Sequence, residues 1–140
     1  MRFLLDTCVI SELVSKRPDP GVVQWIDDVG EEKIYLSAIT VGEIKKGIEK
    51  LPNSRRKSAL TGWLEDDLLT RFRNKILPID VGVMLVWGEL TAKLEMQGRK
   101  LPAMDSLIAA IALSGNLSLV TRNEDDFKHL DIPITNPWNG

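Results

Sequence analysis

The chain alternates short apolar runs with segments in which apolar residues recur at helical spacing. The first run, 3–5, ends at Asp6 and has the length and composition of a strand buried on both faces. Further apolar runs follow at 34–36, 76–79, 117–120 and 132–134, and we expect the last at a sheet edge. The intervening stripes predict helices over 8–15, 21–29, 37–50, 54–73, 81–97 and 104–113, and a helical turn over 123–127.

Several of these boundaries carry residues with capping chemistry. Ser37 and Asp80 stand where a side-chain oxygen can accept from the free N–H groups of a first helical turn. Gly30 and Gly98 stand where two helices should end. Strands that alternate with helices predict an α/β fold, a three-layer α/β/α sandwich with a mainly parallel central sheet. No repeat, low-complexity segment or long linker interrupts the pattern, so we expect one domain over 1–140.

Composition narrows the class of protein. Hydrophobic residues make up 44% of the chain, enough for a core without disulfides, and no apolar run reaches the roughly 18 residues of a membrane span. Cys8 is the only cysteine, so no disulfide can form within the chain and we expect a cytoplasmic protein. The net charge of −2 argues against nucleic-acid binding through bulk charge. Any contact with RNA would need a local basic patch, or metal ions that offset the acids.

Acidic residues follow two of the predicted strands. In a parallel sheet, sites form beyond the carboxyl ends of the strands. Asp6 comes directly after the first strand and fits two roles, the N-cap of the next helix and a metal-binding carboxylate. Four oxygen-bearing side chains follow the 117–120 strand, more than a capping loop needs: Thr121, Asn123, Asp125 and Asp126.

Two further acids lie on predicted helices. Glu43 is at the edge of the buried face of the 37–50 helix, a position that suits a solvated glutamate as well as a functional one. Gly47, one turn on, is costly inside a helix, and we expect it to clear space beside Glu43 for a metal or for backbone. Asp105 opens a helix that is otherwise apolar, either as its cap or as a buried acid that needs a cation as partner.

The donor types limit the chemistry. Oxygen ligands suit Mg²⁺ or Mn²⁺, whereas His129 is the only histidine and Cys8 the only cysteine, which excludes a His/Cys zinc cluster and paired-histidine acid–base catalysis. Most basic residues should be solvated. Those that neighbour one of the acids in sequence are the candidates for phosphate contacts, namely Lys46, Arg99, Lys100 and Arg122.

Four stretches now form an ordered set, 4–12, 37–44, 101–110 and 119–127. Together they resemble the PIN-domain ribonucleases, and within them the VapC-type toxins of toxin–antitoxin pairs, with the FitB-like subgroup as one option. The resemblance implies that the metal-binding acids are Asp6, Glu43, Asp105 and Asp126. It assigns supporting roles to Thr7, Thr121 and Asn123. Asp125 adjoins Asp126, and the latter is preferred because family members typically carry the acid just before the phenylalanine, here Phe127.

The resemblance also implies a function. It predicts a Mg²⁺- or Mn²⁺-dependent endoribonuclease that hydrolyses RNA phosphodiester bonds and leaves 5′-phosphate and 3′-hydroxyl ends. A cognate antitoxin, usually a small DNA-binding protein, would hold it inactive, and such toxins commonly form homodimers. No membrane association is expected. The RNA target stays open, because discrimination between RNAs would depend on loop geometry and a few side chains.

Three alternatives compete with this hypothesis. An acidic-rim phosphohydrolase of the haloacid type would need a second aspartate two positions after Asp6, where Cys8 stands. A receiver-like signalling module would need an acidic pair after the first strand and a lysine after the last buried one, where Thr121 and Arg122 stand. The third alternative is a catalytically inert PIN-like module that only binds a protein partner, which a test for metal-dependent RNA cleavage would distinguish.

Overall fold

The computed structural model describes residues 1–139 and contains a five-stranded sheet of order β3-β2-β1-β4-β5. Every pairing is parallel, with Leu4 opposite Tyr35 on one side and Leu119 on the other. This confirms the predicted α/β class. The strands are β1 (Phe3–Leu5), β2 (Ile34–Ser37), β3 (Ile76–Leu77), β4 (Ser118–Val120) and β5 (Ile134–Thr135). The edge strand β5 begins two residues later than the sequence predicted, and β3 is shorter than expected.

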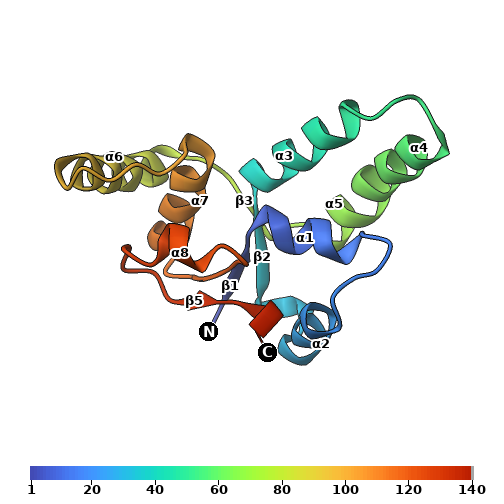
Figure 1. Ribbon diagram of the computed structural model, residues 1–140, viewed down its shortest axis with the longest axis horizontal. Coiled ribbons are helices and arrows are strands. Elements are labelled where there is room, and N and C mark those ends of the chain that lie inside the picture. Colours follow the sequence, from blue (N-terminus) through green and yellow to red (C-terminus); the bar gives the residue numbers. More distant parts are fainter. Residues whose placement is uncertain (140) are drawn as a thin grey trace.

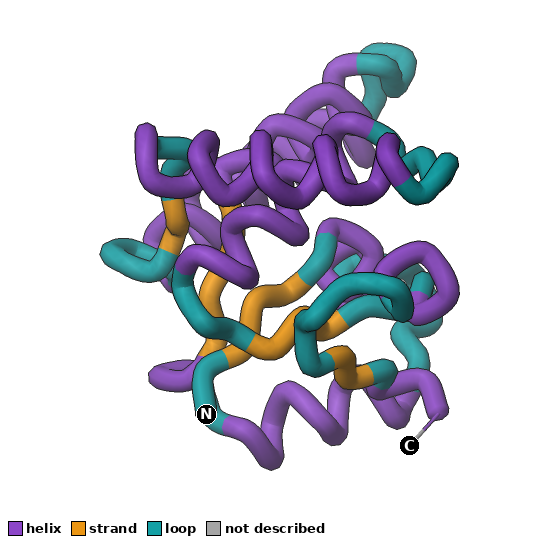
Figure 2. The backbone as a smooth tube through the Cα atoms, turned by 90° about the vertical axis from the view of Figure 1, so that its left-hand side faces the viewer, coloured by secondary structure: helices purple, strands orange, loops and turns teal. Residues whose placement is uncertain are grey.

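Helices lie on both sides of the strands (Figures 1 and 2). The α-helices are α1 (Thr7–Leu13), α2 (Pro20–Val29), α3 (Ala38–Glu49), α4 (Arg55–Gly62), α5 (Leu69–Arg71), α6 (Val81–Met96), α7 (Ala103–Ser114) and α8 (Glu124–Phe127). Short 3₁₀ turns occupy η1 (Glu31–Lys33) and η3 (Pro137–Asn139).

The predicted caps are present. The Ser37 hydroxyl accepts from the Thr40 N–H at 3.1 Å, and the Asp80 carboxylate accepts from the Val83 N–H at 2.8 Å. Gly30 and Gly98 have φ angles of 91° and 72°, a backbone region in which side-chain-bearing residues are strained. These local signals explain why the ends of α2, α3 and α6 match the sequence prediction closely.

The predicted 54–73 helix is not a single α-helix. A π-helical segment, η2 (Trp63–Leu68), joins α4 to α5. The buried residues Leu64, Leu68 and Phe72 are spaced four apart, whereas an α-helix has about 3.6 residues per turn. Wider turns offset the drift of that spacing, so all three side chains reach the core.

Alternate residues of β1 enter two separate cores, because successive side chains of a strand point to opposite faces. Leu4 packs with α6, α7 and β4, and Phe127 of α8 belongs to the same cluster. Leu5 packs with α1, α2 and the 60–72 region on the opposite face. Figure 1 shows α6 and α7 on one side of the sheet and α1, α2, α4 and α5 on the other, as a three-layer sandwich requires.

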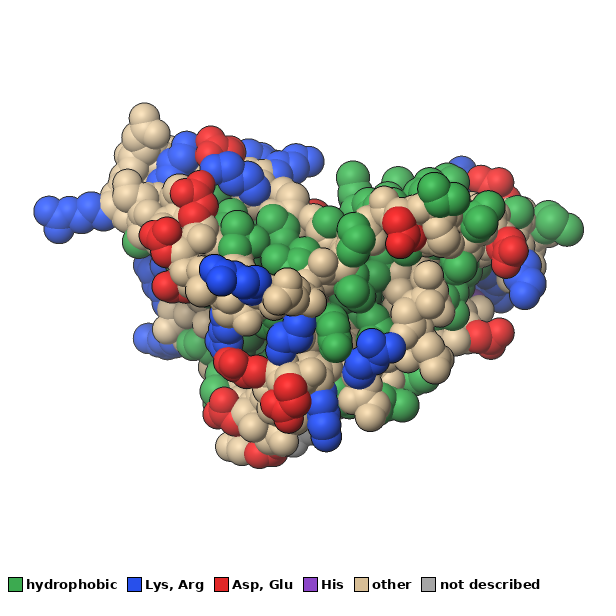
Figure 3. All heavy atoms as spheres, turned by 180° about the vertical axis from the view of Figure 1, so that it is seen from behind, with side chains coloured by type: hydrophobic (Ala, Val, Ile, Leu, Met, Phe, Trp, Pro, Cys, Tyr) green, Lys and Arg blue, Asp and Glu red, His purple; other side chains and the backbone are tan. Residues whose placement is uncertain are grey.

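One surface remains strongly apolar. Ile79, Val81, Met84 and Leu85 are exposed, and the last three recur at helical spacing; we call these four residues the α6 face. Figure 3 shows hydrophobic side chains gathered over this helix. Within residues 1–139, no helix has the length and apolar character to cross a membrane.

Candidate active site

The candidate acids gather beyond the carboxyl ends of the central strands. Asp6 follows β1 directly, and Asp126 lies in α8, just after β4. Glu43 is on α3, the helix that follows β2, and Asp105 is in the first turn of α7. Figure 1 shows α1, α3, α7 and α8 around this end of the sheet. The strand order therefore brings together acids that are up to 120 positions apart in the chain.

Asp6 is only 5% exposed and is held from two directions. One carboxylate oxygen accepts from the Thr7 N–H at 2.8 Å, as an N-cap does, and the other accepts from the Thr121 hydroxyl at 2.8 Å. Asp6 is thus both a helix cap and a buried acid tied to the end of β4. Burial raises its pKa above the ordinary value, and Glu43 adds to the rise, whereas the hydrogen bonds from Thr121 and Thr7 oppose it.

A hydroxyl chain connects α1 to α3. The Thr7 hydroxyl donates to a Glu43 carboxylate oxygen at 2.6 Å and lies 3.0 Å from the Thr40 hydroxyl. Thr40 is fully buried and is also 3.3 Å from the Ser37 hydroxyl. Sequence reasoning missed Thr40; its place three residues after the cap residue Ser37 was the available signal. This series of hydroxyl contacts fixes the direction in which the Glu43 side chain points from α3.

Asp105 does not cap its helix, so the capping alternative is wrong. Pro102 occupies the N-cap position of α7, and no side chain caps that end. The pKa of Asp105 rises from 3.8 to about 6, first because of burial and then because of the charges of Asp6, Glu43 and Asp126. The other three candidate acids are therefore all within electrostatic range of Asp105.

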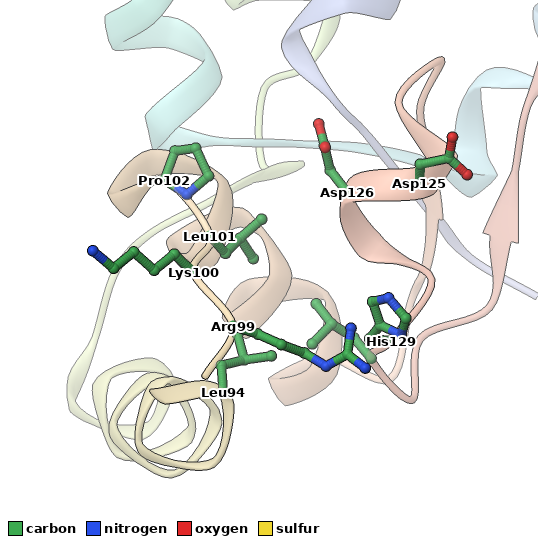
Figure 4. A pocket seen from close by; sticks show the side chains of 9 residues that line it. Leu94, Arg99, Lys100, Leu101, Pro102, Asp125, Asp126 and His129 are labelled. Carbon is green, nitrogen blue, oxygen red and sulfur yellow. The ribbon is translucent and has the colours of Figure 1, made fainter. Parts of the chain in front are cut away.

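Asp125 and Asp126 are both exposed, but their side chains point in different directions. The Asp125 side chain is 93% exposed and lies 3.6 Å from the Lys128 ammonium group. Asp126 acts on the pKa of Asp105, and Figure 4 shows its carboxylate pointing in a different direction from that of Asp125. Asn123 contributes through its backbone, since its N–H donates to the Thr121 hydroxyl at 3.0 Å, while its side chain is exposed.

The acids do not form a finished coordination shell. Across residues 1–139, no three His, Cys, Asp or Glu side chains converge closely enough to hold a metal ion as they stand. A Cβ added at Gly42 or Gly47 would meet nothing within 4 Å. Of the two alternatives for Gly47, a close approach of backbone is therefore wrong, and the space beside Glu43 is open. The cluster is one of mutual repulsion between carboxylates rather than of direct contact.

Cys8 lies beside this cluster but has little reactivity of its own. Its thiol is 3.8 Å from an Asp6 oxygen and 3.7 Å from the Thr121 hydroxyl. Burial raises the pKa of the thiol, so it stays protonated at neutral pH and is a weak nucleophile.

The candidate basic residues take different positions. Arg99 and Lys100 line a cavity of about 260 Å³ together with Asp126, and Lys46 lines another of about 560 Å³ together with Glu43. Arg122 lies over the ring of Trp138, 5.4 Å from its centre, and so is partly engaged within the fold. Sequence reasoning missed His129, which joins Arg99 in the first cavity; its position one helical turn after Asp126 was the available signal.

An apolar groove adjoins the acids on the side of α1, α3 and α4. It has a volume of about 290 Å³ and begins at Thr7 and Glu43. Trp63 and Leu60 form part of its apolar wall, with Arg56 at the same groove. An elongated apolar segment of another protein would fit such a groove and would lie close to Glu43.

Comparisons with known proteins concern the family and the fold. A family model described as "PIN domain" matches residues 3–133. The toxin FitB of Neisseria gonorrhoeae is 38% identical over 136 residues, 97% of this chain and 98% of that protein. The VapC ribonuclease Y4jK of Sinorhizobium fredii is 35% identical, covering 96% of each. The crystal structure of FitAcB from N. gonorrhoeae superposes with a TM-score of 0.93 at 37% identity and covers 99% of both chains.

Proposed function

This chain belongs to the PIN-domain family, and from that premise we propose that it is a metal-dependent endoribonuclease, the toxin of a toxin–antitoxin pair. The substrate is RNA, as the ribonuclease name of its 35%-identical relative suggests. The observation that carries the proposal is the placement of the buried Asp6 directly after β1, with Glu43 held beside it through the Thr7 hydroxyl. Burial raises the pKa of Asp105, and the charges of Asp6, Glu43 and Asp126 add to the rise. The acids lie at the end of the sheet where α/β enzymes place their chemistry.

The donor set fits a hard divalent cation. Carboxylate oxygens are the ligands that Mg²⁺ and Mn²⁺ prefer, and crowded carboxylates bind a cation because it relieves their repulsion. Asp6, Glu43 and Asp105 are the proposed ligands, and Asp126 either joins them or orients a water molecule. When bound, the ion supplies Lewis-acid polarisation of the scissile phosphate and activation of water. Because the acids do not yet converge, we expect their side chains to adjust on binding.

The chain's own residues then have definite tasks. Thr121 and the Thr7 N–H hold both oxygens of Asp6, so that carboxylate enters the reaction already oriented. The Thr7 hydroxyl does the same for Glu43. Water attacks the phosphorus, the bond to the 3′ oxygen breaks, and the departing oxygen takes a proton. The products carry 5′-phosphate and 3′-hydroxyl ends.

The test is cleavage of RNA by the purified protein with Mg²⁺, with Mn²⁺ and with EDTA. We expect cleavage only in the presence of a divalent ion, and its abolition in Asp6→Asn and Asp105→Asn with the fold intact by circular dichroism. Asp27→Asn is the matched control and should keep its activity, because Asp27 is exposed on α2 and lines neither the acid cluster nor the cavity beside it. Full activity in both of the first two variants would refute the assignment. A wild type that binds antitoxin but never cleaves RNA would instead favour the inert module.

The partners follow from the same proposal. A cognate antitoxin, itself a DNA-binding protein, would place a C-terminal segment in the groove lined by Trp63 and Leu60, next to Glu43. A second copy of this chain would pack on the α6 face, where Val81 and Leu85 are 76% and 67% exposed. We place the protein in the cytoplasm, where its RNA substrate is found.

A further inference from the structure

The cavity between the α6–α7 loop and the segment after α8 has features of a nucleotide-binding subsite. Arg99 and Lys100 come from the loop, and His129 comes from the segment after α8. Asp126 lines the same cavity, which therefore adjoins the proposed catalytic acids. Figure 4 shows the Arg99 side chain extending across the cavity toward the His129 ring. Two segments 30 positions apart thus present nitrogen donors to one space.

The cationic donors in this cavity are unpaired. Within residues 1–139, neither Arg99 nor Lys100 lies within 4 Å of a carboxylate oxygen. Of the two acids that line the cavity, Asp125 pairs with Lys128, and Asp126 has no ion-pair partner among residues 1–139. A guanidinium group without an internal partner is free to bind an external anion, and its fork geometry matches a phosphate.

The loop that carries Arg99 is held in place. Gly98 takes the left-handed conformation that ends α6, and the Arg99 N–H donates to the Leu94 carbonyl at 2.9 Å. Pro102 then fixes the entry into α7. The Arg99 backbone is thus ordered before any ligand arrives, which lowers the entropy cost of binding.

Apart from the three basic residues and the two aspartates, Asp125 and Asp126, the lining is apolar. Leu94, Leu101, Pro102 and Leu130 provide it. Inorganic phosphate would gain nothing from such a wall, whereas the ribose and base of a nucleotide would pack against it. A volume of about 260 Å³ has room for a single nucleotide rather than for a duplex.

We propose that this cavity binds the nucleotide that flanks the scissile phosphate of the RNA, with Arg99 and His129 on its phosphate and the leucines and Pro102 against its base or ribose. The inference rests on the proposed ribonuclease function and adds a binding site to it. This subsite also explains how an acidic protein could attract RNA. A protein of net charge −2 with a cluster of carboxylates repels RNA, and unpaired donors beside that cluster supply local attraction.

Kinetics separate this role from a catalytic one. Arg99→Ala and His129→Ala should each raise KM for a single-stranded RNA oligonucleotide by about tenfold, the size of one charge-assisted hydrogen bond, with kcat within about twofold. Arg99→Lys should recover part of the loss, since it keeps the charge but not the fork. The control is Arg73→Ala, because Arg73 is exposed and precedes β3, at the opposite end of the sheet from the acids.

Direct binding gives a second readout. In the Asp6→Asn background, anisotropy of a labelled oligonucleotide measured against salt should show a slope smaller by about one when Arg99 becomes alanine. Thermal melts check that each variant folds, and Arg99→Gln replaces Arg99→Ala if the latter does not.

Each outcome has one meaning. Wild-type cleavage with unchanged KM and RNA affinity in Arg99→Ala and His129→Ala overturns the subsite and leaves the ribonuclease proposal standing. A fall in kcat at constant KM also overturns it, because the residues would then act on the chemistry. Loss of antitoxin binding with unaltered RNA kinetics assigns the cavity to the protein partner instead. If the wild type neither binds nor cleaves RNA, the ribonuclease proposal fails and the subsite fails with it.

Discussion

Replacing Asp105 by asparagine should stabilise the metal-free protein at neutral pH. The pKa of this carboxyl rises from 3.8 to about 6 in the fold, so its charged form is less stable in the folded protein than in the unfolded chain. Below about pH 3 the group is neutral in both states and costs nothing. As pH rises from about 3 to about 6, the unfolded chain releases the proton first, and stability falls.

The size of this change in the free energy of unfolding follows from the same pKa shift. A rise from 3.8 to about 6 corresponds to about 3 kcal/mol for a fully desolvated group. The Asp105 side chain is only partly buried, and screening by solvent reduces the figure to about 1 kcal/mol. For a domain of this size, 1 kcal/mol corresponds to about 3 °C in Tm. Asparagine has nearly the same shape as aspartate and no charge. We therefore expect Asp105→Asn to raise the free energy of unfolding by about 1 kcal/mol at pH 7.

The assay is urea unfolding of wild type and Asp105→Asn from about pH 3 to about pH 8 in EDTA, repeated with excess Mg²⁺. The two curves should converge near pH 3 and separate toward pH 7, with the variant the more stable. Added Mg²⁺ should stabilise the wild type and act less on the variant. Asp27→Asn makes the same change on the exposed surface of α2 and should stay within about 0.5 kcal/mol of wild type. A variant less stable than wild type at pH 7 in EDTA would refute the reasoning, because the carboxylate would then have a favourable partner.

Three further substitutions test other parts of the account. Thr121→Val removes the hydroxyl that donates to Asp6 and accepts from the Asn123 N–H, and should cost about 1–3 kcal/mol in urea unfolding together with most of the cleavage activity; unchanged activity would mean that Asp6 needs no such support. Gly47→Ala should raise the free energy of unfolding by about 0.5–1 kcal/mol, since a Cβ there meets no atom and helical glycine is costly; a loss would show that the position is crowded. Leu85→Glu should convert a dimer to a monomer in light scattering with an unchanged circular dichroism spectrum, and a persistent dimer would exclude the α6 face as the contact.

The fold was predictable where local chemistry fixes it. Ser37 and Asp80 marked helix starts, and Gly30 and Gly98 marked helix ends, because each satisfies backbone groups or a backbone angle that the sequence alone can indicate. The π-helical segment η2 was not predictable in this way. It depends on the core that Leu64 and Leu68 must reach, and the shape of that core is set by distant elements.

The site residues, too, were predictable only where local sequence was sufficient. Asp6 and the 125–126 pair could be placed from the rule that sites lie beyond strand ends, which needs only local sequence. Glu43 and Asp105 could not, because they lie on helices, and their approach to Asp6 depends on the strand order 3-2-1-4-5. Only the family resemblance suggested that they join. His129 was missed for a similar reason, since its cavity forms between two segments whose proximity the sequence does not reveal.

The most direct test of the central claim is a crystal structure of the protein soaked in Mn²⁺, with anomalous diffraction used to locate the ion. We expect an anomalous peak about 2.0–2.3 Å from oxygens of at least two of the proposed ligands Asp6, Glu43 and Asp105, with Asp126 turned toward the same space. No peak at saturating Mn²⁺, or a peak elsewhere in protein that still cleaves RNA, would contradict it.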